Sequence, residues 1–266
     1  MLYDEFDRLE SESAPAERRP AHAVQRSTPI LHNEAVFMHL PPSALLASDL
    51  FQAVYARKRP VVSRLPLAST DSARTMLYSG ERLDQFDLDV LLACMESSAH
   101  TGRRTGTCVG MMTGGIARAM KRPDDRATRR KTALSLQRMA CGLLEVSNGR
   151  LHYTLRIINR LLLDSTQDRC VVEFSPQVFA ALRSLPDMRS FTRSRFALRA
   201  RSLERWLHGM VYVSSEMCIP FDQLGPLSGG CAGSRTALHA TVRQLCTAGA
   251  LPVQGEDEAG IVISRG

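Results

Sequence analysis

Several features that define other protein classes are missing from this sequence of 266 residues. It has no apolar run of the ~18 residues that a membrane-spanning helix needs. Its first stretch, Met1 to Glu12, is acidic and lacks the basic and then apolar order of a signal peptide. We therefore expect a globular chain that stays in the cytoplasm and has no membrane partner.

Motifs for the common catalytic and metal sites are missing as well. There is no Gly-x-x-x-x-Gly-Lys-Ser/Thr segment to hold the phosphates of a nucleotide. The seven cysteines form no Cys-x-x-Cys pair, and the seven histidines are scattered, so neither zinc ligands nor the paired histidines of a DNA-nicking site are grouped. We expect no catalytic residue, no metal and no cofactor, and we interpret the cysteines as reduced, mostly buried thiols.

Two segments resemble chemical sites but have simpler interpretations. Gly229 to Gly233 has the spacing of a hydrolase nucleophile elbow around Cys231, yet no buried strand precedes it, which favours a flexible turn. Asp84, Asp87 and Asp89 are close enough in sequence to suggest metal ligands. They stand at the start of a predicted helix, however, where acidic side chains cap the chain and complement the helix dipole.

Positive charge is concentrated in two segments. The net charge is +7, and Arg118 to Lys131 and Arg183 to Arg205 each carry seven basic residues against two acidic ones. The remainder of the chain is therefore net negative. Basic charge gathered in this way is typical of a surface that binds a polyanion, although each segment alone also fits a solvated charged face.

The order of predicted elements divides the chain into three parts. Residues 1–69 contain seven prolines and no sustained period, which predicts a largely irregular arm with one short helix from Pro42 to Arg57. Residues 70–185 and 186–266 each read as helix, strand, helix, turn, helix and hairpin. We predict an α+β fold of two tandem winged-helix domains, joined near Pro186, behind the arm.

The first domain contains the following predicted elements. A core helix begins near Asp84 with an apolar stripe through Leu88, Leu91, Leu92 and Met95. The later elements are strand 107–111, helix 113–121, helix 125–140, a hairpin of 143–147 and 150–163 around Asn148-Gly149, strand 170–174 and helix 176–183. We interpret the 143–163 hairpin as the wing. Its second strand is so apolar that it needs either internal cover or a partner, so we expect a homodimer in exchange with a monomer.

The second domain ends in the helix and hairpin that would enter DNA. We predict one helix from Ser194 through Met210, a small strand 211–213, helix 221–227, helix 234–248 and a hairpin of 251–254 and 260–264. At 100° per residue Leu238, Val242 and Leu245 share one side of helix 234–248. Its other side carries Thr236, His239, Arg243 and Gln244, the side-chain types that read base edges.

One segment of the first domain resembles a known family. Leu83-Asp-Gln-Phe-Asp-Leu-Asp-Val90, preceded by Tyr78-Ser-Gly80, is similar to the signature of the TrfA-type plasmid replication initiators. The likeness extends from about Met76 to the end of the chain, with Leu91 where members commonly have tryptophan. It implies tandem winged helices that bind the iteron repeats of a plasmid origin. It also implies recruitment of the host replication initiator and the replicative helicase.

The residues and the resemblance together predict a DNA-binding protein that is not an enzyme. Besides the base-reading set, we expect phosphate contacts from five arginines, which would set affinity and register more than sequence preference: Arg126, Arg130, Arg201, Arg205 and Arg235. A winged-helix transcriptional repressor is the alternative function. An origin-nicking enzyme is a more distant one.

Overall fold

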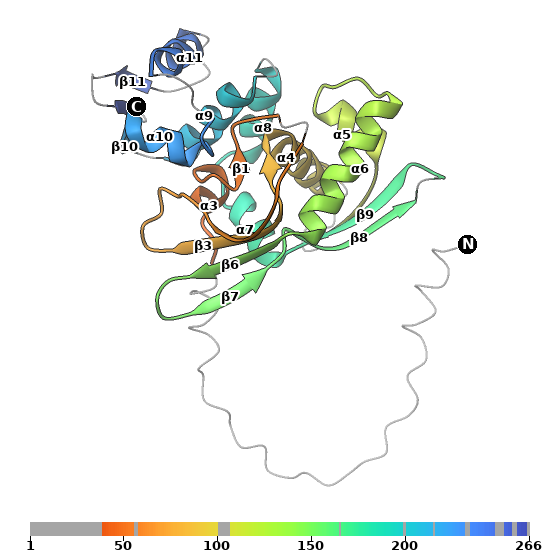
Figure 1. Ribbon diagram of the computed structural model, residues 1–266. Coiled ribbons are helices and arrows are strands. Elements are labelled where there is room, and N and C mark those ends of the chain that lie inside the picture. Colours follow the sequence, from red (N-terminus) through yellow and green to blue (C-terminus); the bar gives the residue numbers. More distant parts are fainter. Residues whose placement is uncertain are drawn as a thin grey trace, which may run out of the picture. The chain divides into compact units, whose positions relative to one another are not determined.

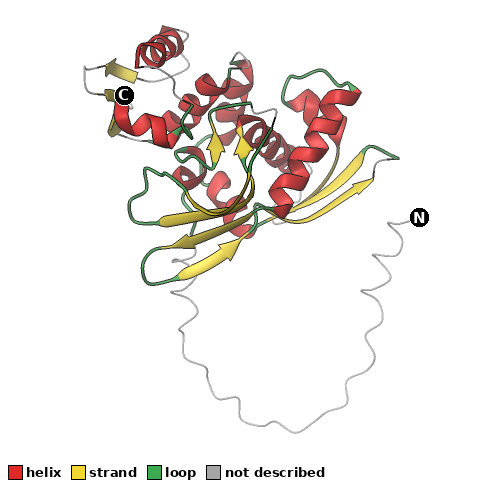
Figure 2. Cartoon of the chain, viewed as in Figure 1, coloured by secondary structure: helices red, strands yellow, loops and turns green. Residues whose placement is uncertain are grey.

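Helices and small sheets alternate along the chain, which confirms the predicted α+β class (Figures 1 and 2). The computed structural model describes residues 39–55, 58–100, 107–164, 166–198, 201–214, 216–231, 235–247, 253–256 and 260–264. These residues all belong to one compact unit of the chain.

Helix α4 (Gln85–His100) lies at the centre of this unit and contacts α5, α6, α8 and α9. Its predicted stripe is buried, with Leu91 and Leu92 fully inaccessible. Asp84 caps the helix as predicted, because its Oδ1 accepts hydrogen bonds from the backbone N–H groups of Phe86 at 2.8 Å and Asp87 at 3.3 Å.

The first winged helix follows α4 along the chain. It consists of β5 (Cys108–Met112), α5 (Thr113–Ala119), α6 (Arg126–Cys141), β8 (Ile158–Asp164) and β9 (Arg169–Phe174), with the sheet ordered β5-β9-β8. Asp125 caps α6 by accepting from the backbone N–H of Thr128 at 2.7 Å. Alternation places Cys170, Val172 and Phe174 of β9 in the core. Helix α7 (Pro176–Arg183) follows this sheet in the sequence.

The second winged helix repeats this order. It consists of α9 (Ser202–Val213), β10 (Glu216–Pro220), α10 (Phe221–Leu227), α11 (Arg235–Thr247), β11 (Val253–Glu256) and β12 (Gly260–Ser264). Its sheet is ordered β10-β12-β11. In both units the strand before the helix pair is joined to the second strand of the terminal hairpin, as the registers Val109↔Val172 and Cys218↔Val262 show.

The wing of the first unit differs from the prediction. Strands β6 (Leu143–Ser147) and β7 (His152–Leu155) form a hairpin around Gly149, at φ +83°, but they belong to another sheet, ordered β2-β3-β6-β7. The chain leaves that sheet at Arg156, and the hairpin equivalent to β11–β12 is β8–β9. The predicted continuous strand 150–163 is therefore wrong. Ile157 and Ile158 are both buried, which interrupts the alternation that one strand requires.

The helix predicted from Ser194 through Met210 is also divided. Helix α8 (Met188–Ala197) ends where Leu198 adopts an extended conformation, with ψ 147°, and α9 begins at Ser202. Residues 211–213 continue α9 instead of forming a strand. The next strand, β10, follows them.

Residues 39–69 pack into the body and do not form an irregular arm, although the sequence groups them with residues 1–38, which lie outside the described ranges. Helix α3 (Pro42–Leu46) is shorter than predicted, and β1 (Phe51–Gln52) pairs in parallel with β4 (Leu83–Asp84). Strand β2 (Val61–Pro66) pairs with β3 (Thr75–Glu81). Short apolar runs lie between the prolines of this segment. Four of their side chains are fully buried: Leu40, Leu45, Leu50 and Phe51.

Buried apolar side chains form two clusters. The larger one joins α4 to the first winged helix, α7 and α8, and includes Phe196. The other gathers Trp206, Met210, Leu238 and Val242 with Ala47 and Ala53 from the N-terminal segment. The change of cluster falls between Phe196 and Trp206, beyond the predicted joint at Pro186, and the domain boundary stays a prediction.

Candidate nucleic-acid interface

Helix α11 separates its two faces as its sequence predicts. Leu238, Val242 and Leu245 are buried, at 2%, 0% and 2% exposure, and pack in the second apolar cluster. Thr236, Arg243 and Gln244 are exposed, and His239 is half-buried. The packed face fixes the helix on α9, so the polar face is presented as a rigid surface.

The hairpin beside α11 completes the winged-helix order of the C-terminal region. Strands β11 and β12 pair antiparallel, with a register shift between Val253 and Gly255, and β12 also pairs with β10. A winged helix contacts DNA with its second helix in the major groove while the adjoining strands lie against the backbone. The arrangement of α11 and the hairpin is compatible with that mode.

Arg205 does not lie on this surface, so its predicted outward orientation is wrong. Its side chain is 4% exposed, and Nη1 donates to Oδ2 of Asp89. Nη2 lies 3.5 Å from the carbonyl oxygen of Leu198. A buried carboxylate on α4 therefore holds this guanidinium inside the protein, and Arg205 is a structural residue.

Two other arginines of the second winged helix are predicted to bind phosphates, Arg201 and Arg235. The side chain of Arg201 is 63% exposed, and its Nη1 lies 3.6 Å from Oε1 of Glu204. Ion pairs this exposed are weak, so the guanidinium is available to an anion. Arg235 begins α11, and its side chain lies outside the described residues.

Helix α6 presents a second basic surface. Arg126 and Arg130 are both exposed on it, as predicted. Arg129 is only half-buried but is tied to Asp124, whose Oδ1 accepts from its Nε at 2.6 Å. This interaction lowers the pKa of Asp124, which keeps the carboxylate charged. Arg126 and Arg130 face solvent, and neither forms an ion pair with an acidic residue of the described ranges.

Helix α4 carries a buried ion network that the sequence does not predict. Oδ1 of Asp87 accepts from Oγ of Ser135 at 2.6 Å and from Nη2 of Arg138 at 2.8 Å, both on α6. Its Oδ2 accepts from Nη1 of Arg59 at 2.5 Å. Because Asp87 is fully buried, these bonds compensate a charge that would otherwise be costly to bury.

Asp89 performs the same role toward α8 and α9. It is fully buried and pairs with Arg195 on α8 and Arg205 on α9, while Nη2 of Arg122 lies 3.5 Å away. Asp87 also has the predicted role at the helix start, because its Oδ2 accepts from the backbone N–H of Asp84 at 2.9 Å. At 100° per residue Asp87 and Asp89 flank the apolar stripe, one on each side of Leu88, and no local signal shows that arginines distant in the sequence cover them.

The described residues contain no group of three His, Cys, Asp or Glu side chains suited to holding a metal. Burial raises the pKa of the Cys231 thiol, the opposite of what an activated nucleophile needs. In the described ranges no helix combines the length and the apolar character required to cross a bilayer.

The chain is similar in fold to domains 2 and 3 of RctB. A crystal structure of a selenomethionine derivative of these domains matches with a TM-score of 0.56 at 12% identity, over 82% of this chain and 88% of that chain. A crystal structure of RctB domains 2-3 matches with a TM-score of 0.51 at 12% identity, over 79% of this chain and 83% of that one. At such identity the likeness concerns the fold alone, and it agrees with two consecutive winged-helix-like units. No family model matches the sequence, and no curated protein matches it.

Proposed function

We propose that this protein is a replication initiator that binds repeated sites in the origin of a plasmid. The observation that carries the proposal is the polar face of α11, where Thr236, Arg243 and Gln244 are exposed opposite a fully packed apolar face. Arginine pairs with the acceptor edge of guanine and glutamine with adenine, so this face has the chemistry for major-groove reading.

Phosphate contacts would come from the two winged helices together. Arg201 stands before α9 of the second unit, and Arg126 and Arg130 lie on α6 of the first. Arg235 is assigned the same role by its place at the start of α11. Contacts of this kind add affinity and fix register, and they make binding depend on salt.

The choice of replication over another DNA function rests on two likenesses. The segment Leu83 to Val90 resembles the TrfA-type initiator signature, and the fold resembles domains of RctB, which is a replication initiator. By the same resemblance the protein acts without enzymatic chemistry. It would recruit the host replication initiator and the replicative helicase, as a homodimer that dissociates on DNA.

A plasmid-maintenance experiment tests this function. A plasmid that carries the candidate origin and no other replicon is introduced with the wild-type gene or with Arg243→Ala. Replication only with the wild-type gene supports initiation. Specific DNA binding without replication would favour the transcriptional repressor, and strand cleavage in the presence of a divalent metal would favour a nicking enzyme.

The DNA around the gene provides a second, independent readout. Directly repeated sites protected from nuclease by the purified protein support an initiator that binds iterons. Two half-sites about one helical turn apart would instead support a dimeric repressor.

A further inference from the structure

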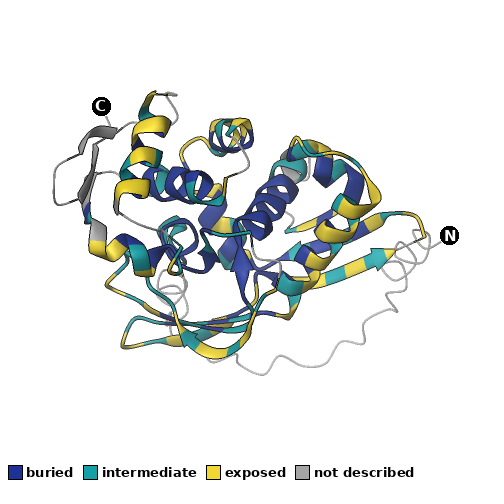
Figure 3. Ribbon diagram, turned by 45° about the horizontal axis from the view of Figure 1, so that its top comes forward, coloured by how far each residue is buried: buried dark blue, intermediate teal, exposed yellow. Residues whose placement is uncertain are grey.

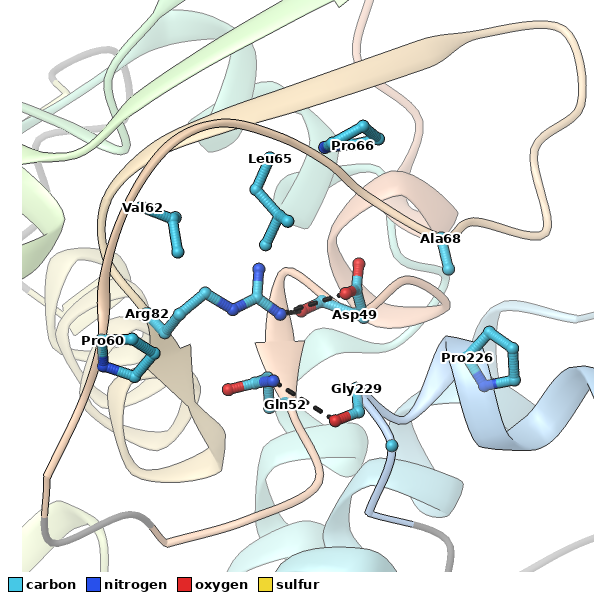
Figure 4. A pocket seen from close by; sticks show the side chains of 11 residues that line it. Asp49, Gln52, Pro60, Val62, Leu65, Pro66, Ala68, Arg82, Pro226 and Gly229 are labelled. Atoms are coloured by element: carbon cyan, nitrogen blue, oxygen red, sulfur yellow. Dashed lines mark hydrogen bonds and ion pairs between the residues drawn. The ribbon is translucent and has the colours of Figure 1, made fainter.

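A cavity of about 430 Å³ lies between strand β2 and the turn that follows α10 (Figure 4). Val62 and Leu65 of β2 form its apolar side, and Pro226 and Gly230 belong to the opposite one. Its volume is in the range of pockets that hold small ligands. Neither winged-helix surface described above includes it.

The polar side chains of this cavity are Asp49, Gln52 and Arg82, of which Arg82 is 3% exposed. Oδ1 of Asp49 is buried without a hydrogen-bond partner among the described residues. Nη2 of Arg82 donates to the carbonyl oxygen of Asp49 at 2.7 Å and to its Oδ2 at 3.0 Å. Nη1 is buried and has no hydrogen-bond acceptor in the part of the chain that the structure describes. Figure 4 shows the guanidinium in the middle of the lining residues, with its second terminal nitrogen facing Leu65.

The charges around Arg82 determine which kind of hydrogen-bond acceptor the cavity can hold. Asp49 already compensates the guanidinium, and the other lining residues are uncharged. A carboxylate or phosphate would therefore bring a net negative charge into a partly desolvated space, which is unfavourable. An uncharged carbonyl oxygen satisfies Nη1 without that penalty.

The two glycines of the turn after α10 add no side chain to the opposite side of the cavity. Gly229 and Gly230 have φ +72° and +79°, a conformation that favours glycine. Nε2 of Gln52 lies 3.4 Å from the carbonyl oxygen of Gly229, and a Cβ on Gly229 would approach this nitrogen to 2.6 Å. A Cβ on Gly230 would meet no atom within 4 Å, so this side has room for a ligand.

We propose that the cavity is a binding site for a small uncharged molecule that has an amide-type carbonyl oxygen and a branched apolar body. The carbonyl oxygen accepts the free hydrogen bond from Nη1 of Arg82. The apolar body packs on Val62 and Leu65. Since β2 belongs to the N-terminal part and Gly230 follows α10, a bound molecule bridges two segments that are far apart in the sequence.

Protein-detected NMR titration of the full chain with 4-methylpentanamide tests this site. We expect saturable shifts at Gln52, Leu65 and Gly230, with an affinity in the millimolar range because the probe is small. The probe should also raise the melting temperature, since it binds only the folded protein. 4-Methylpentanoate, which shares the apolar body but is charged, should bind about tenfold more weakly.

Two variants separate the donor from the cavity itself. Arg82→Lys keeps a cation beside Asp49 but removes the planar donor, and it should weaken amide binding by about tenfold. Ala68→Leu fills space at the lining and should weaken the binding of both probes. Arg74→Lys, at the half-buried Arg74–Asp71 pair outside the lining, is the matched control and should bind like the wild type.

The proposal is overturned if the wild type shows no saturable shifts, or if Arg82→Lys binds the amide as tightly as the wild type does. Tighter binding of the carboxylate would overturn the assignment of an uncharged ligand. If Ala68→Leu does not fold, as judged by circular dichroism, the comparison of Arg82→Lys with Arg74→Lys decides the matter. None of these measurements depends on DNA binding.

Discussion

Nε of Arg195 donates a hydrogen bond to Oδ1 of Asp89 at 2.8 Å, although 106 residues separate the two in the sequence. Both side chains are fully buried. Nη1 of Arg195 also donates to the carbonyl oxygen of Arg205 at 2.6 Å, and Nη2 donates to Oε1 of Gln85 at 2.7 Å. One guanidinium thus fastens α8 to the start of α4 and to α9. The relative placement of α4 and these helices depends on charged side chains as well as on apolar packing.

Asp89→Asn should destabilise the protein strongly. The substitution leaves Arg195 and Arg205 buried without their counter-charge, which should lower the free energy of unfolding by about 3–5 kcal/mol. Urea denaturation followed by circular dichroism measures the change. Asp71→Asn, at the half-buried Asp71–Arg74 pair, should cost less than about 1 kcal/mol. Equal stability of Asp89→Asn and the wild type would contradict the network.

Arg201→Ala and Arg205→Ala should differ in kind. Arg201 is exposed, so its loss should leave stability unchanged, weaken binding to all DNA sequences alike and reduce the salt slope by about one phosphate contact. Arg205 is buried against Asp89, so its loss should lower the melting temperature. Fluorescence anisotropy at several salt concentrations and a thermal melt distinguish them. A stable Arg205→Ala variant with a reduced salt slope would instead indicate that Arg205 contacts a DNA phosphate.

Arg243→Ala should change sequence preference and not affinity alone. Loss of one bidentate base contact costs roughly 1–3 kcal/mol at the preferred site and relaxes the choice of base at one position. Binding to a library of single-base site variants measures this preference. Arg189→Ala removes an exposed arginine of α8 and serves as the matched control. If affinity fell equally for all site variants, the base-reading face would not lie on α11.

Leu162→Lys should test self-association without unfolding the protein. Leu162 is 56% exposed on the outer side of β8, whereas Ile157 is 3% exposed in the core. The β8–β9 hairpin projects with exposed residues along it (Figure 3). We expect Leu162→Lys to remain folded and to shift a dimer toward monomer in sedimentation velocity, whereas Ile157→Lys should unfold.

The control for this experiment is Thr154→Lys, an exposed position on β7 in the other sheet. It should leave the assembly state unchanged. A wild-type protein that sediments as a monomer at every concentration, with or without DNA, would remove the predicted dimer. A dimer that Leu162→Lys leaves intact would place the interface elsewhere.

Stability should fall as the pH drops from 7 toward 5, in part because of His208. Burial and the nearby charges of Arg195 and Arg205 lower the pKa of His208 to about 3. The unfolded chain, with a histidine pKa near 6.5, binds the proton first, so the contribution is complete above pH ~6.5 and decreases toward pH 3. Between pH 7 and pH 5 it amounts to about 2 kcal/mol.

Urea denaturation at several pH values measures this slope. His208→Gln should flatten it, while His152→Gln, at an exposed position on β7, should leave it unchanged. The wild-type slope persisting in His208→Gln would assign the pH dependence to other groups. The ring of His208 stacks on Phe191 and accepts or donates one hydrogen bond with Ser194 at 2.9 Å, so some loss of stability at all pH values is also expected.

Elements with local signals can be predicted from the sequence alone. The periodicity of α11 correctly separated Leu238, Val242 and Leu245 from Arg243 and Gln244. Local signals predicted the helix 125–140, which Asp125 caps, and the tight turn at Asn148-Gly149. The repeated order of helices and strands indicated two winged helices. Each of these features depends on residues that are close together in the sequence.

Which strands share a sheet and which charges are buried depends on contacts between distant parts of the chain. Leucine and isoleucine recur from Leu151 to Leu163 on both sides of Arg156, so no local signal shows that the chain passes there from one sheet to another. Helical periodicity places Arg205 on the same side of the chain as the exposed Arg201. Arg205 lies inside because Asp89, 116 positions earlier, provides a buried carboxylate that compensates its charge. Partners this distant in the sequence are brought together by packing, and packing alone determines whether an arginine faces DNA or the core.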